Sequence, residues 1–120
     1  MATQDRCCTI VPYFKVSEGN LDDFKSLCEQ AVERANGEPG CLYYGFSFNG
    51  HEVFCRGGYN DADAALFHLG NIAPVLQEML KVSEIARLEV HGPADELAKL
   101  REPMAAMNPT FFTLEYGFRR

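Results

Sequence analysis

Residues 41–59 carry the pattern that most limits how this chain can fold. Two aromatic-rich runs flank Asn49-Gly50, the pair favoured in a two-residue type I′ hairpin. With that turn, the expected cross-strand pairs on one side are Phe48–His51, Phe46–Val53 and Tyr44–Cys55. Aromatic residues also occupy the other side, so both faces of this ribbon need to be covered. A single chain of 120 residues has too few other elements to do so, and we therefore expect a homodimer.

The remaining sequence alternates between strand and helix patterns. The predicted strands are 7–16, 41–48, 51–59, 85–91 and 112–118. The predicted helices are 21–35, 62–81 and 95–107. Pro12 predicts an edge position or a bulge for the first strand, and Gly70 and Pro74 predict a kink or a break in the second helix. The order β-α-β-β-α-β followed by α-β indicates an α+β, ferredoxin-like domain with a C-terminal extension.

Composition excludes several functional classes. A length of 120 residues fits one domain spanning 1–120, and a net charge of −6 argues against binding to nucleic acid or an anionic membrane. No apolar run approaches the roughly 18 residues of a membrane span. The five cysteines form no CxxC pair and the three histidines lie far apart, so we expect reduced thiols, no bound metal and a cytoplasmic location.

Two local motifs resemble the antibiotic-biosynthesis-monooxygenase family of dimeric α/β-barrel proteins. The first is the joint Glu38-Pro-Gly-Cys-Leu-Tyr-Tyr44, and the second is a stretch in which Tyr59, Asp61, Ala64 and His68 fall in the family register. The acidic residue that begins the second stretch in the family is replaced by Gly57. The resemblance covers a core of about 7–91 and leaves 92–120 as the extension.

The resemblance implies a homodimer in which two sheets pack face to face, with a pocket between each sheet and its helices. Some members oxygenate polyketide anthrones or quinols with dioxygen and without metal or flavin, so it implies no cofactor. Relatives that degrade haem use a tryptophan, and this chain contains none, which disfavours that activity. Such an oxygenase needs a base that titrates near neutral pH, hydrogen bonds to the substrate anion and apolar walls.

His68 is the candidate base, because histidine titrates near neutrality and this one lies near the inward stripe of its helix. Asn71 could orient a substrate oxygen and Tyr59 could donate to an oxyanion, although each could equally be structural. The candidate wall of the pocket consists of aromatic residues: Phe14, Phe24, Tyr44, Phe46, Phe48 and Phe67.

These residues lead to three hypotheses. The first is a small cofactor-independent monooxygenase acting on a phenolic, quinol or polyketide-like molecule. The second is a non-catalytic dimer that binds an apolar small molecule such as a fatty acid, which Gly57 and the absence of tryptophan both favour. The third is a purely structural or partner-binding dimer.

Overall fold

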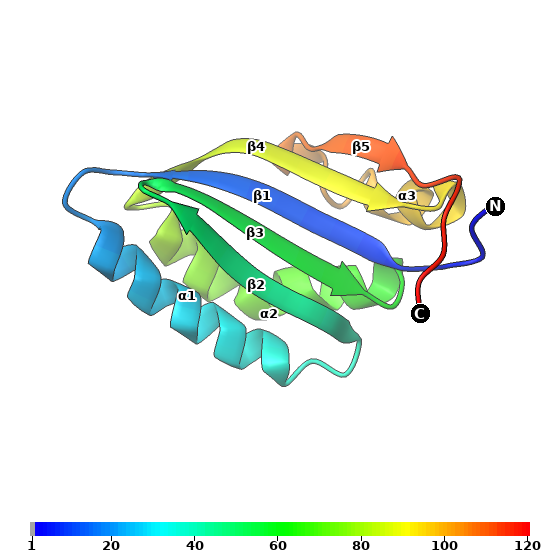
Figure 1. Ribbon diagram of the computed structural model, residues 1–120, viewed down its shortest axis with the longest axis horizontal. Coiled ribbons are helices and arrows are strands. Elements are labelled where there is room, and N and C mark those ends of the chain that lie inside the picture. Colours follow the sequence, from blue (N-terminus) through cyan, green and yellow to red (C-terminus); the bar gives the residue numbers. More distant parts are fainter. Residues whose placement is uncertain (1) are drawn as a thin grey trace.

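A computed structural model describes residues 2–120 and confirms the α+β, ferredoxin-like order (Figure 1). The elements are β1 (Cys8–Val16), α1 (Leu21–Asn36), β2 (Cys41–Asn49), β3 (Glu52–Tyr59), α2 (Ala62–Met79), β4 (Ser83–Gly92), α3 (Ala94–Leu100), the 3₁₀ turn η1 (Ala105–Met107) and β5 (Thr110–Thr113). They form one five-stranded sheet in the order β2-β3-β1-β4-β5. All neighbours are antiparallel except β4 and β5, which run parallel.

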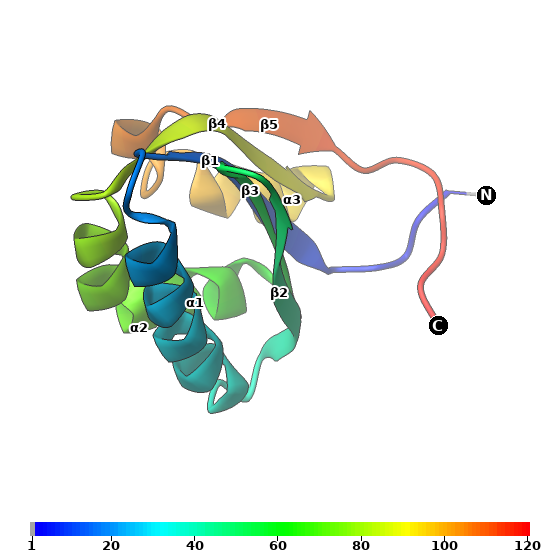
Figure 2. The ribbon, with the colours of Figure 1, turned by 60° about the vertical axis from the view of Figure 1, so that its left-hand side comes forward.

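Both long helices pack on one face of the sheet and leave the other face open (Figure 2). Two clusters of buried side chains fill the space between sheet and helices, one centred on Phe14 and Phe24 and the other on Tyr59 and Leu97. β1 is a central strand, and the irregularity expected near Pro12 is a register shift between Tyr13 and Phe14 against β4.

The hairpin forms, but its turn lies one residue later than expected. Asn49 pairs with Glu52, so Gly50-His51 is the two-residue turn, and Phe48 faces Val53 rather than His51. Only Gly50 of the turn has a positive φ, at 59°, whereas a type I′ turn needs positive φ at both central residues. The predicted pairing was therefore wrong by two residues, a shift that keeps every side chain on its predicted face.

Three predicted elements differ from the structure. α2 is one continuous helix that contains Pro74, so the predicted break is absent. The third helix ends at Leu100 instead of 107, and the last strand ends at Thr113 instead of 118. The strand stops because β4 ends at Gly92, whose carbonyl accepts the last bond of this ladder from Leu114 N–H at 2.8 Å.

Beyond β5 the chain leaves the sheet and runs beside the N-terminal segment. Thr3 N–H donates to the Glu115 carbonyl at 2.9 Å, and the Arg119 guanidinium binds Asp5 at 2.8 Å. Residues 2–6 and 114–119 thus form an arm of two antiparallel segments, joined by an isolated bridge between Ala2 and Tyr116, that projects from the rim of the sheet, away from α1 and α2 (Figure 2).

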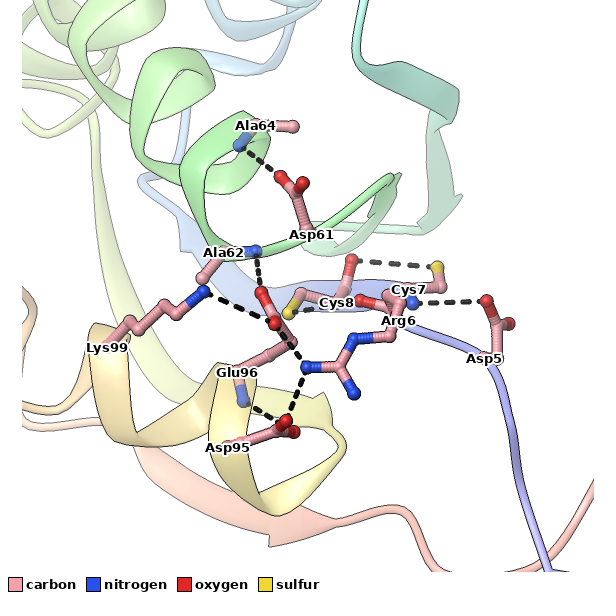
Figure 3. A network of polar contacts seen from close by, with 10 residues as sticks. All are labelled: Asp5, Arg6, Cys7, Cys8, Asp61, Ala62, Ala64, Asp95, Glu96 and Lys99. Carbon is pink, nitrogen blue, oxygen red and sulfur yellow. Dashed lines mark hydrogen bonds and ion pairs between the residues drawn. The ribbon is translucent and has the colours of Figure 1, made fainter.

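A buried carboxylate joins the extension to the core at the start of α2 (Figure 3). Glu96 of α3 is 3% exposed and accepts the Ala62 backbone N–H at 2.8 Å, and it also pairs with Arg6 and Lys99. The Ala62 bond and the Arg6 guanidinium lower the pKa of Glu96. The negative charge also faces the positive end of α2, so this contact fixes α3 and the base of the arm.

Within residues 2–120, none of the helices combines the length and hydrophobicity that crossing a membrane requires.

Candidate functional site

His68 is buried between α2 and the sheet and is paired with a carboxylate. The ring nitrogen Nδ1 lies 3.0 and 2.9 Å from the two carboxylate oxygens of Glu38, which follows α1 in the loop to β2. Both side chains are nearly inaccessible, at 3% and 2% exposure. Because a carboxylate only accepts hydrogen bonds, Nδ1 carries the proton and Nε2 holds the free lone pair.

Asn71 acts on Glu38 in this structure. Its Nδ2 donates to Glu38 Oε2 at 2.8 Å and to the Arg34 carbonyl at 3.0 Å, and the Arg34 guanidinium donates back to the Asn71 carbonyl at 2.9 Å. These bonds tie the end of α1 to α2 and hold the carboxylate against the imidazole. Asn71 therefore acts on His68 indirectly, through Glu38.

Burial sets the protonation state of His68. Desolvation lowers the pKa of the imidazole below its usual value of 6.5, and the Glu38 charge opposes this shift without reversing it. A neutral ring near pH 7 can accept a proton at Nε2. Within the described part of the chain no hydrogen bond engages that nitrogen, so its lone pair is free.

Two tyrosine rings flank the imidazole. The centroid of Tyr44 lies 4.9 Å and that of Tyr59 4.7 Å from the centroid of His68. Burial raises the pKa of both phenols, so they remain protonated donors. The Tyr59 ring lies back along β3 and covers Gly57. A Cβ added at Gly57 would lie 2.2 Å from the hydroxyl oxygen of Tyr59. The glycine that departs from the family pattern thus makes room for Tyr59.

The two motifs noted in the sequence contact each other. Glu38 of the first motif binds His68 of the second, and a Cβ added at Gly40 would lie 2.6 Å from the Cβ of Ala64. The Gly40 carbonyl also accepts the Asn60 N–H at 2.9 Å. The absence of a side chain at residue 40 therefore lets the loop pack closely against α2, which places Glu38 next to His68.

A small apolar cavity of about 40 Å³ lies beside His68, between the sheet and α2. We call it the His68 cavity. Of the aromatic residues expected to form the pocket wall, Phe14, Tyr44 and Phe46 line it. Phe24 is fully buried behind Phe14, and Phe48 lies further along the same face of β2, where its ring packs against Phe24 with the centroids 6.4 Å apart. Phe67 is 60% exposed to solvent and does not line the cavity.

Metal-ligating side chains do not gather at this site. Among residues 2–120, no three His, Cys, Asp or Glu side chains come close enough together to hold a metal ion. The five cysteines, all within this range, are free thiols. Burial raises the pKa of Cys55, which also lines the His68 cavity, to about 12, so this thiol stays protonated near neutral pH and is a poor nucleophile.

The fold is similar to that of several solved structures, among them antibiotic-biosynthesis-monooxygenase-like proteins. SnoaB from Streptomyces nogalater, a cofactor-independent oxygenase, superposes with a TM-score of 0.64 at 17% identity, covering 71% of this chain and 90% of SnoaB. Rv0793 from Mycobacterium tuberculosis gives 0.65 at 18% identity, covering 75% of this chain and 97% of that one. A candidate antibiotic biosynthesis monooxygenase from Caulobacter crescentus gives 0.64 at 19% identity over 72% and 88% of the two chains.

The particular family follows from a much nearer relative. MupZ from Pseudomonas fluorescens is 48% identical, with a TM-score of 0.94, and the match covers 100% of this chain and 94% of MupZ. The chain therefore belongs to the MupZ family. No protein-family model matches the sequence, and no curated protein matches it either.

Proposed function

We propose that the protein is a cofactor-independent monooxygenase in which His68 removes a proton from a hydroxyl or an activated C–H of a phenolic, quinol or polyketide-like molecule. The observation that carries this proposal is the buried Glu38–His68 pair, whose Nε2 is free beside an apolar cavity. Glu38 fixes the tautomer and stabilises the imidazolium that forms as the proton arrives. The likeness to SnoaB supports the reaction class.

The reaction balances without an added reductant. The substrate carbanion, or the carbon of its enolate or phenolate form, bonds to dioxygen and gives a hydroperoxide after protonation. Loss of water from the hydroperoxide leaves a new carbonyl, so one oxygen atom enters the product and the other leaves as water. Tyr44, whose ring lines the His68 cavity, is the candidate donor for the developing oxyanion, whereas Tyr59 contacts the imidazole but does not line that cavity. The apolar walls limit access of water.

Oxygen uptake with a panel of anthrones and hydroquinones tests this proposal. We expect His68→Ala to lower the rate by about 10²–10⁴, as loss of a general base does, and His51→Ala at the exposed hairpin tip to leave it unchanged. His68-dependent proton removal in air without any oxygen uptake would retain His68 as the base but refute the oxygenase. Equal oxygen uptake by wild type and His68→Ala would refute both.

A second candidate function is non-catalytic binding of an apolar small molecule. The nearly apolar lining of the His68 cavity favours it, because the wall offers few groups to a polar reactant. Native mass spectrometry of the purified protein would show a bound apolar compound in that case. Saturable binding without oxygen uptake for any member of the panel would select this function over the oxygenase.

We further infer a homodimer formed through the open face of the sheet. That face carries the Tyr13–Phe54 ring pair, with centroids 5.3 Å apart, and the stacked His91–Phe112 pair at 4.9 Å. Phe112 is 40% exposed in the single chain, and the arm stands beside this face (Figure 2). A stable dimer would bury more than roughly 1,200 Å² in total. The free thiols favour a reducing, cytoplasmic location.

A further inference from the structure

The outward side of α2 is apolar, although it meets solvent in the single chain. Residues 64–77 contain no Asp, Glu, Lys or Arg, and within this stretch Phe67, Gly70 and Pro74 are exposed. α1, which packs on the same face of the sheet, shows the ordinary pattern of a surface helix (Figure 2). Its exposed positions are mostly charged: Asp22, Asp23, Lys25, Glu29, Glu33 and Arg34.

Five residues form this surface, which we call the outer α2 face: Leu66, Phe67, Gly70, Ala73 and Pro74. By helical spacing they lie on one side of α2, away from its buried residues. Leu66 and Ala73 are half-buried, whereas Phe67 is 60% exposed. The open face of the sheet lies on the other side of the molecule, so a dimer formed through the sheet leaves the outer α2 face accessible (Figure 2).

Gly70 has no packing role within its own chain. A Cβ added there would meet no atom within 4 Å, and the φ of Gly70 is not positive. Glycine is nevertheless, after proline, the least favourable residue in the interior of a helix. Pro74 has no N–H, so the Gly70 carbonyl also lacks its usual helical donor. The bare backbone at Gly70 allows a second helix to approach closely, with Cα–H···O contacts across the crossing.

The charges around the outer α2 face limit the partners that it fits. Without a charged residue in 64–77, the face offers no ion pair to a strongly acidic or basic segment. Asp63 and Glu78 bound the stretch, and their carboxylates would be repelled by an anionic membrane surface. The face therefore complements another neutral, apolar surface, and a second copy of this chain supplies one.

The residue sizes on either side of Gly70 are self-complementary. The large Leu66 and Phe67 precede Gly70 by four and three residues, and the smaller Ala73 and Pro74 follow it by three and four. When two copies of α2 cross antiparallel at Gly70, Phe67 of one copy faces Ala73 of the other, and Leu66 faces Pro74. A parallel crossing would oppose Phe67 to itself and leave gaps at Ala73. A two-fold interface requires this kind of self-complementarity.

The same crossing keeps the acidic ends of the two helices apart. Asp63 and Glu78 lie seven and eight residues from Gly70, which is about 10–12 Å along the helix axis. At the common crossing angle of about 50°, with axes about 8–9 Å apart at the contact, the two axes are separated by roughly 12 Å at these residues. This separation exceeds the Debye length of about 8 Å at physiological salt, so the repulsion is screened.

We propose that the outer α2 face joins two copies of the chain through an antiparallel crossing of their α2 helices at Gly70. Five residues a side are far fewer than the roughly 20–30 of a standard interface, so the association is weak and reversible. The proposal depends neither on a reaction at His68 nor on the dimer inferred through the open face. Where that dimer forms, the α2 contact joins dimers into larger assemblies.

Sedimentation equilibrium from about 10 μM to about 1 mM protein tests the contact. We expect the wild-type mass to rise with concentration toward at least about twice its initial value. Phe67→Lys should weaken this association at least about tenfold, because it buries a charge in the contact. Leu80→Lys is the matched control, since Leu80 is 44% exposed and lies outside the outer α2 face, and it should stay within about twofold of wild type.

Gly70→Leu separates a specific crossing from general adhesion of apolar surfaces. Leucine is a better helix former and fits the open space at residue 70, so the variant should raise the midpoint of urea denaturation. It should also weaken association at least about tenfold, because the added side chain keeps the two backbones apart. Stronger association would mean that exposed apolar area alone drives the assembly, and it would refute the crossing.

Disulfide trapping with the thiol oxidant diamide tests the geometry. A two-fold axis at Gly70 brings residue 70 of both copies within the about 7 Å between Cα atoms that a disulfide spans, so Gly70→Cys should form a covalent dimer. Gln77→Cys is the control, because it is exposed on the same helix and its antiparallel copy lies roughly 20 Å away. Wild type gives the background from the native thiols.

Three results would overturn the proposal. The first is a wild-type mass that does not change with concentration. The second is association as strong as that of wild type in Phe67→Lys or in Gly70→Leu. The third is cross-linking of Gln77→Cys as readily as Gly70→Cys, which would show a parallel or non-specific contact. None of these results bears on oxygen uptake, so the proposed function is tested separately.

Discussion

Replacing Glu38 by alanine tests whether this carboxylate organises the site. The change removes the acceptor for one buried donor, His68 Nδ1–H, and for one N–H of the half-buried Asn71 amide. An unsatisfied buried donor costs about 1–3 kcal/mol. Asn71 keeps its bond to the Arg34 carbonyl, so we expect a total loss of about 2–4 kcal/mol in the free energy of unfolding.

Glu38→Gln provides a graded comparison. It keeps the volume and one acceptor oxygen but replaces charge-assisted hydrogen bonds by neutral ones, which lowers each by about 1 kcal/mol. We therefore expect an intermediate loss of about 1–2 kcal/mol. Glu102→Ala is the control, because Glu102 is exposed in the turn after α3 and should change stability by no more than about 0.5 kcal/mol.

Urea denaturation of the three variants and wild type, followed by circular dichroism, measures these differences. A loss below about 1 kcal/mol for Glu38→Ala would mean that the carboxylate does not hold His68 in solution. A loss for Glu38→Gln as large as that for Glu38→Ala would show that charge, rather than an acceptor oxygen, supplies the stabilisation.

Three further predictions concern other parts of the account. Gly57→Ala should lower the free energy of unfolding, measured by urea denaturation, by about 1–3 kcal/mol because the added Cβ displaces the Tyr59 ring. Gly45→Ala is the control, since a Cβ added there meets nothing within 4 Å and should change stability by less than about 0.5 kcal/mol. Equal effects of the two variants would contradict the placement of Tyr59. The lowered pKa of His68 means that the unfolded state binds more protons near pH 6, so stability should fall as the pH drops below 6.5 and level off below the folded pKa. A His68→Gln variant should lose this component, and an unchanged pH dependence would refute it. Deleting residues 108–120 should weaken the homodimer or cause aggregation, which light scattering measures, and an unchanged mass and solubility would show that the arm plays no part in assembly.

The order of elements was predictable because it depends on local periodicity. The spacing of apolar residues located both long helices, and the Asn49-Gly50 pair located the hairpin to within one residue. The exact turn was predicted wrongly because the Asn-Gly pair forms a type I′ turn only when both of its residues take a positive φ. In this structure Gly50 takes a positive φ and Asn49 does not. Turn type is decided by how the two strands pack in the sheet, which a local motif does not contain.

Glu38 is the residue of the site that sequence reasoning missed. It lies 30 residues from His68 and reaches it only because the loop after α1 presses against α2 at Gly40. A signal was present, since Glu38 begins one motif and His68 ends the other, and two motifs of one family can be expected to meet. Asn71 was predicted to orient a substrate oxygen, and in the structure its side chain binds Glu38, a contact that could not be predicted without knowing where Glu38 lies.

The most direct test of the account is a nitrogen NMR measurement of His68 in the wild-type protein over a range of pH. Long-range ¹H–¹⁵N spectra distinguish the two neutral tautomers from the imidazolium. The structure predicts a neutral ring at pH 7 with the proton on Nδ1 and an unprotonated Nε2, titrating below pH 6.5. A proton on Nε2 at pH 7, in the other tautomer or in an imidazolium, would contradict the assignment of His68 as a base oriented by Glu38.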